Sequence, residues 1–147
     1  MHGFLLFAHL IGVVVWIGGM FFAAICLHPS LAALAPKDRM ALMSGTLGRF
    51  LDYVVGAIVL IWASGLVLVA DAGLVGMAVG WHLMIGIGLL MTLIFVWLYL
   101  GLFRPARRAV ERGDLNAVPA AMARIRKLVL INLVLGVGAI ASVTLLA

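Results

Sequence analysis

Residues 3–27 read GFLLFAHLIGVVVWIGGMFFAAICL, and this stretch decides the fold of the chain. It contains one ionisable residue, His9, and is followed at once by His28 and Pro29. About 20 apolar residues in a helix cross the hydrocarbon core of a bilayer, because each adds about 1.5 Å. The stretch therefore predicts a membrane-spanning helix. Ionisable groups inside such helices are costly, so His9 is the first candidate for a functional residue.

The composition of the whole chain indicates a membrane protein. Of the 147 residues, 67% are hydrophobic and only 10% are charged, and the mean hydropathy is +1.31. A water-soluble domain of this length does not need so much apolar surface. Three further apolar runs follow the first one. We therefore predict an all-α integral membrane four-helix bundle, a single domain with spans at residues 3–27, 53–70, 80–103 and 128–146.

The basic residues predict the orientation of the bundle. All ten Lys and Arg lie in two connections, at residues 37–49 and 104–127. By the positive-inside rule these connections are cytoplasmic and both chain termini lie outside. We expect a multi-pass protein of the cell inner membrane. The net charge of +5 does not indicate nucleic-acid binding, because the basic residues sit between spans. It indicates attraction to the anionic lipids of the bilayer.

Two histidines are predicted to lie at similar depths. His9 lies 19 residues before His28, which follows span one, and His82 lies 22 residues before Arg104, which follows span three. The difference of three residues corresponds to about 4.5 Å of rise. Neutral imidazole is a good ligand for haem iron and copper, and helical bundles build such sites from facing side chains. His9 and His82 are therefore the candidate ligand pair, near the outer face. The alternative is two interfacial histidines bonded to backbone or water.

Residues at helical spacing extend this candidate site. Gly12 and Gly86 follow His9 and His82 by about one turn, so each shares a face with its histidine. They leave room for a planar macrocycle or, alternatively, allow close helix packing. Trp16 and Met20 continue the stripe from His9. They line an apolar pocket in one interpretation and form ordinary bundle core in the other, which is the commoner role of such stripes.

Weaker candidates lie at the ends of the spans. His2 is a possible mobile third ligand, or simply a frayed terminus. His28 and Cys26 form a Cys-x-His pair, a weak signal for a soft metal because residues two apart point to different faces of a helix. The single cysteine excludes an intramolecular disulfide. Asp71 ends span two on the outer side and is a candidate to orient a ligand imidazole from the second shell, or a solvated helix end.

Two polar features concern helix packing. Asn132 lies inside span four, where an amide side chain is expected to form an interhelical hydrogen bond. Arg49 and Asp52 are three residues apart at the start of span two, and we expect them to form an ion pair.

Several segments resemble the copper-resistance D (CopD) family of membrane proteins. The opening helix carries the pattern His9-(x)6-Trp16-x-Gly18-Gly19-Met20-Phe21, continuing to Leu27-His28-Pro29. Further matches are Leu47-Gly48-Arg49-Phe50, Trp81-His82 and the basic loop before span four. The resemblance covers most of the chain and implies copper handling in the inner membrane. Full CopD proteins are larger than this four-helix unit, so a homodimer is expected to restore the larger bundle.

The chain is also similar in plan to HemJ-type membrane proteins, which bind haem and are linked to protoporphyrinogen oxidation. The His-(x)6-Trp pattern recurs there, and the resemblance implies that His9 is a haem ligand. That family carries a functional lysine in its third helix. The corresponding stretch here, residues 81–85, reads WHLMI and has none. The difference argues against protoporphyrinogen oxidation and leaves His9 and His82 as candidate ligands.

The sequence as a whole predicts a CopD-like membrane protein with a redox-active metal centre between spans one and three. Haem b is the favoured cofactor, for electron transfer with an unidentified redox partner or for haem and copper homeostasis; membrane haem oxidoreductase activity is then possible. Two imidazoles leave no open position on the iron, which suits electron transfer. Copper binding and transport through His9, His82, Met20 and His2 is the first alternative. A structural or assembly subunit without a cofactor is the second.

Overall fold

The computed structural model describes residues 1–73, 76–114, 116 and 118–146. These residues are almost entirely helical and contain no strand. Four continuous helical rods among them are long and apolar enough to cross a membrane: His2–Ala33, Pro36–Ala72, Val79–Glu111 and Val118–Leu145. The predicted all-α bundle of four membrane helices is therefore confirmed. Each rod contains its predicted span, apart from the last residue of span four, and three rods extend well beyond it.

The first rod contains two π-helical segments and a 3₁₀ turn, and the third contains one π-helical segment. The first consists of α1 (His2–Val13), η1 (Val14–Gly18), α2 (Gly19–Phe21), η2 (Phe22–Leu27), α3 (His28–Ser30) and η3 (Leu31–Ala33). The second is α4 (Pro36–Ala72), the third is α5 (Val79–Trp97), η5 (Leu98–Phe103) and α6 (Arg104–Glu111), and the fourth is α7 (Val118–Leu145). Segments η1, η2 and η5 are π-helical, and η3 is a 3₁₀ turn. A π-helical turn bonds i to i+5, so it shifts the register of the residues that follow.

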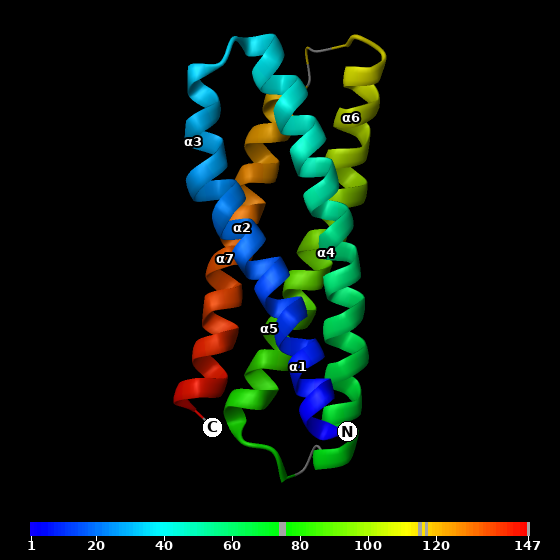
Figure 1. Cartoon of the computed structure of the whole chain (residues 1–147), viewed down its shortest axis with the longest axis vertical. Helices are drawn as coiled ribbons and strands as arrows, with labels where there is room; N and C mark the ends of the chain where they lie inside the picture. Colours follow the sequence, from blue (N-terminus) through cyan, green and yellow to red (C-terminus); the bar gives the residue numbers. More distant parts are fainter. Residues whose placement is uncertain (74–75, 115, 117, 147) are drawn as a thin grey trace.

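Both chain termini lie at one end of the bundle, and α3, the start of α4 and α6 lie at the other (Figure 1). We call these the terminal end and the basic end, because the second carries all ten Lys and Arg. At 37 residues, α4 is about 55 Å long, whereas the hydrocarbon core is about 30 Å thick. Its predicted span, residues 53–70, is only the apolar part of this helix. Gly73, at φ +77°, ends α4 at the terminal end.

The rods associate as two tight pairs, α1 with α4 and α5 with α7. In the second pair, a side chain at Gly80 would collide with the carbonyl oxygen of Ser142. The two backbones approach so closely there that Gly80 N donates to Leu146 O at 3.3 Å, and Ser142 Oγ donates to Gly80 O at 3.1 Å. The pairs meet at mid-length around buried apolar residues of all four rods, including Trp16, Leu51, Phe95 and Ile125.

Candidate functional site

His9 lies on α1 and turns toward α4, half-buried between the two helices. Its Nδ1 is 3.1 Å from the carbonyl oxygen of Ile61 and 3.3 Å from Ser64 Oγ. A carbonyl oxygen can only accept, so the bond to Ile61 requires the proton on Nδ1. In the neutral ring, the other nitrogen, Nε2, then keeps its lone pair. This is the state in which histidines bind metals, with the ring orientation set by the opposite nitrogen.

Gly65 makes the space that the His9 ring occupies. A Cβ at this position would lie 3.2 Å from Cε1 and 3.3 Å from Nδ1 of the imidazole. Ser64, next to it, is buried and donates its own proton to the carbonyl oxygen of Leu60 at 2.6 Å. The Ser64 hydroxyl is therefore left as an acceptor for the imidazole. Ser64 and Gly65 were not among the predicted site residues, although a serine next to a glycine inside an apolar run is a visible signal.

Gly12, one turn along α1 from His9, serves the contact with α4. A Cβ there would lie 2.7 Å from Ile61 Cγ1 and 3.0 Å from the carbonyl oxygen of Ala57. Of the two interpretations offered for Gly12, the structure displays close helix packing, since α4 fills the space beside it.

His82 lies in the first turn of α5 and is exposed. Its Nδ1 is 3.2 Å from the carbonyl oxygen of Ala78, four residues earlier. The tautomer is therefore the same as that of His9, with a lone pair on Nε2. Gly86, one turn later, is also exposed, and a Cβ there would meet nothing within 4 Å. The face with His82 and Gly86 consequently points away from the bundle core, whereas His9 points at α4.

Two of the weaker metal candidates, Met20 and His28, are too far from His9 to share an ion with it. Along the helix axis they lie about 16 and 28 Å from His9 at about 1.5 Å per residue, whereas ligand bonds are about 2 Å. His2 lies two turns, about 10 Å, from His9 and stays a predicted third ligand. Asp71 is exposed at the end of α4 and has no hydrogen bond to an imidazole within the described residues. No group of three His, Cys, Asp or Glu suited to a metal occurs in that part of the chain.

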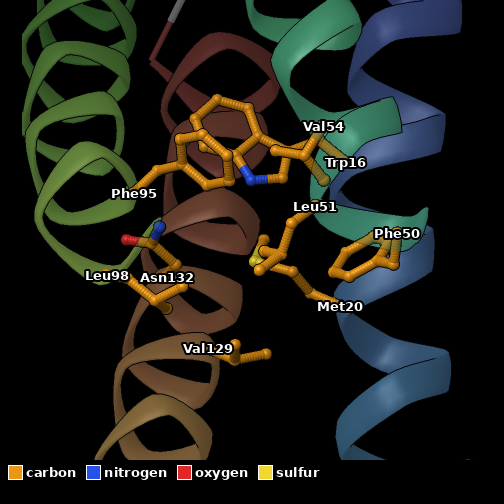
Figure 2. A pocket seen from close by; sticks show the side chains of 9 residues that line it. All are labelled: Trp16, Met20, Phe50, Leu51, Val54, Phe95, Leu98, Val129 and Asn132. Atoms are coloured by element: carbon orange, nitrogen blue, oxygen red, sulfur yellow. The ribbon is translucent and has the colours of Figure 1, made fainter. Parts of the chain in front are cut away.

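The centre of the bundle holds a small cavity of about 10 Å³ (Figure 2). Trp16 and Met20 line it and are 4% and 2% exposed. The Trp16 ring packs edge-on against Phe95, with ring centroids 6.2 Å apart. This space is at the limit for a single water molecule, so it has no room for a macrocycle. Trp16 and Met20 are therefore ordinary residues of the bundle core, which was the second of their two predicted roles.

Asn132, on α7, borders the same cavity (Figure 2). Its Nδ2 donates to the carbonyl oxygen of Met91 on α5 at 3.1 Å, which confirms the expected interhelical hydrogen bond. Its Oδ1 is buried and has no partner among the described atoms. A buried amide oxygen in this state costs free energy unless a water molecule binds it, and the adjoining cavity is the place for one.

The predicted ion pair between Arg49 and Asp52 is not formed. Asp52 instead accepts a hydrogen bond from the hydroxyl of Tyr99 in η5 at 3.1 Å. The one salt bridge among the described residues is Arg107–Glu111, at 3.2 Å. The prediction considered only the spacing within one helix, whereas the tertiary fold brings a competing donor from the third rod to Asp52.

The donor chemistry of His9 and His82 fits a haem iron or a copper ion, because each ring keeps a free Nε2. Neither histidine, however, lines a cavity that could hold such a group within the described residues. The central cavity and a second one near the basic end are both lined by other residues, without His9 or His82. A group held by both rings would have to sit outside the two tight helix pairs.

No family model, curated protein or solved structure matches the chain. The resemblance to the CopD and HemJ-type families stays a prediction based on the motif residues.

Proposed function

We propose that this membrane protein holds a redox-active metal centre near its terminal end, with His9 as the oriented ligand. The observation that supports this most is the hydrogen bond from His9 Nδ1 to the Ile61 carbonyl. It fixes the ring and its tautomer and leaves Nε2 for coordination. Ser64 and Gly65 accommodate the ring on α4.

His82 is the proposed second ligand, and haem b is the favoured cofactor. The hydrogen bond from His82 Nδ1 to Ala78 O sets the same tautomer. The open surface at Gly86 admits a flat group next to the His82 ring. When bound between two imidazoles, haem supplies one-electron redox chemistry without an open iron position. In this proposal the protein acts in electron transfer or in haem and copper homeostasis in an inner membrane, and its redox partner is unidentified.

The test is a visible absorption spectrum of the purified protein, together with elemental analysis for iron and copper. We expect a sharp haem band that is lost in His9→Ala and shifted or weakened in His82→Ala. His28→Ala is the matched control, because it removes an imidazole about 28 Å along the helix from His9 and should leave the band unchanged. Circular dichroism should verify that every variant keeps its helical content.

Other results would change the assignment in defined ways. Copper in place of iron, lost in both His9→Ala and His82→Ala, would keep the ligand pair and replace the cofactor. A colourless protein without bound metal, after expression with added haem and copper, would refute the metal centre and favour a structural or assembly subunit. A cofactor retained in well-folded His9→Ala would refute the role of His9.

A further inference from the structure

Arg49 and Asp52 lie on an exposed face of α4, at the depth of the hydrocarbon core. Phe50, next to Arg49, packs its ring on α1 so closely that a Cβ at Gly19 would collide with it. Gly19 precedes Leu27, where the apolar run of span one ends, by eight residues, or about 12 Å of rise. Both charged residues therefore stand beside an apolar part of α1, well inside the level of the lipid headgroups.

Neither of these charges is neutralised within the protomer. Both side chains are exposed, and neither forms a salt bridge among the described residues. Asp52 Oδ1 accepts a hydrogen bond from the hydroxyl of Tyr99 at 3.1 Å, which holds the carboxylate in place but does not cancel its charge. A charged side chain that faces acyl chains is costly, and pairing with an opposite charge lowers this cost. Arg49 and Asp52 therefore indicate a partner outside the protomer.

The two charged residues belong to a regular stripe along α4, which we call the exposed seam. Its members follow one another at alternating steps of four and three residues, the heptad spacing of helices that pack along a common line. All seven members are exposed: Gly45, Arg49, Asp52, Gly56, Val59, Ala63 and Leu66. The buried residues of α4, such as Leu51 and Ala57, belong to the opposite side of the helix and to the bundle core. The exposed seam is thus free to contact another helix.

Two glycines flank the charged residues of the seam at equal distances. Gly45 precedes Arg49 by four residues, and Gly56 follows Asp52 by four. A Cβ at either glycine would meet nothing within 4 Å, so neither glycine serves packing inside the protomer. Glycine within a helix lowers its stability, whereas small residues allow two membrane helices to approach closely. The glycines therefore favour contact with a second helix on both sides of the charges.

We propose that the exposed seam is the interface of a parallel homodimer, in which Arg49 of each protomer pairs with the partner's Asp52. Two copies have the same orientation in the membrane, because their basic connections lie on the same side. One charge of each sign, a turn apart on one face, is self-complementary around a two-fold axis along the membrane normal. A second copy therefore satisfies both charges at once. His9 contacts α4 at Ile61, on the other side of the helix, so the interface does not depend on the proposed metal centre.

The test measures energy transfer between donor-labelled and acceptor-labelled copies in liposomes, over a range of protein-to-lipid ratios. We expect the native chain to dimerise. Arg49→Asp alone and Asp52→Arg alone should each raise the dissociation constant at least about tenfold, as expected when polar contacts between membrane helices are lost. A mixture of these two variants should associate again, because each supplies the charge that the other lacks. Arg108→Asp is the matched control, since it makes the same change of charge at an exposed position of α6.

Further variants test the close approach along the seam. Gly56→Leu should prevent association, whereas Gly18→Leu, at another exposed glycine whose Cβ would meet nothing within 4 Å, should not. In a Cys26→Ala background, Val59→Cys should form a disulfide-linked dimer on oxidation, because like positions of a parallel pair face each other. Val137→Cys, at an exposed position of α7, should stay monomeric.

Three results would overturn the proposal. A native chain that stays monomeric at every protein-to-lipid ratio would mean that Arg49 reaches the headgroups by itself. Equal association of Arg49→Asp and Arg108→Asp would mean that any dimer uses another face. Failure of the Arg49→Asp and Asp52→Arg variants to associate when mixed, with native helical content by circular dichroism, would refute the reciprocal ion pair.

Discussion

Glycines allow close approach of the helices in both the α1–α4 pair and the α5–α7 pair, but the polar groups that bond across the two interfaces differ. In α1–α4, Gly65 leaves space for the imidazole ring of His9, and His9 Nδ1 donates a hydrogen bond to the backbone of α4. In α5–α7, Gly80 brings two backbones into contact, and the polar side chains of Ser142 and Asn132 bond across the interface. His82 takes no part in that interface and bonds within its own helix.

In this bundle the environment of each histidine depends on the helix that packs against it, and not only on its own helix. His9 and His82 stand in similar apolar surroundings in the sequence, yet only His9 faces a glycine that leaves a recess. The α5–α7 interface uses its glycine for backbone contact, whereas the α1–α4 interface uses its glycine to accommodate the His9 ring.

The largest effect expected from this comparison is at Gly80. Gly80→Ala should lower the free energy of unfolding by about 3 kcal/mol, the upper end for overpacking, because its Cβ meets backbone atoms that cannot move aside. Gly86→Ala on the same helix meets open space and should change it by less than about 1 kcal/mol. Unfolding titrations in mixed micelles measure both. Similar values for the two variants would mean that α5 and α7 are not in close contact at this level.

The next effect concerns the Asn132 hydrogen bond. Asn132→Ala should destabilise the protein by about 1.5 kcal/mol, because it removes an interhelical hydrogen bond and leaves a cavity. Thr144→Ala is the control, since Thr144 is exposed and bonds only to its own helix. The same unfolding titration applies. A loss no greater than that of the control would show that Asn132 contributes nothing to the α5–α7 interface.

The smallest effect is the one that isolates the His9 recess. Gly65→Ala should cost about 1 kcal/mol in the native protein, because the new Cβ presses on the imidazole ring. In the His9→Ala background the same substitution should be neutral or slightly stabilising, since alanine favours the helix. The coupling energy of this double-mutant cycle, about 1 kcal/mol, measures the contact between the two positions. Additive effects would argue that His9 does not face Gly65.

The spans, their number and the Asn132 bond were predictable because each depends on local composition or on one group that must find a partner in lipid. The neighbours of His9 were not. Counting residues at 3.6 per turn assigns His9, Trp16 and Met20 to one stripe, but Trp16 lies inside the π-helical segment η1, which changes the register after His9. His9 thus faces Ile61 on α4, and Trp16 packs on Phe95 of α5. Nothing in the sequence marks that segment.

The unequal charge of the two ends also has an electrical consequence. The basic end carries ten basic and four acidic side chains, a surplus of six positive charges, and Asp71 is the only charged side chain near the terminal end. A membrane potential acts on each elementary charge with about 2.3 kcal/mol per 100 mV. Carrying the surplus across a membrane that is negative on the basic side would therefore cost about 14 kcal/mol per 100 mV. A membrane potential of that sign would therefore hold the bundle in one orientation once it is inserted.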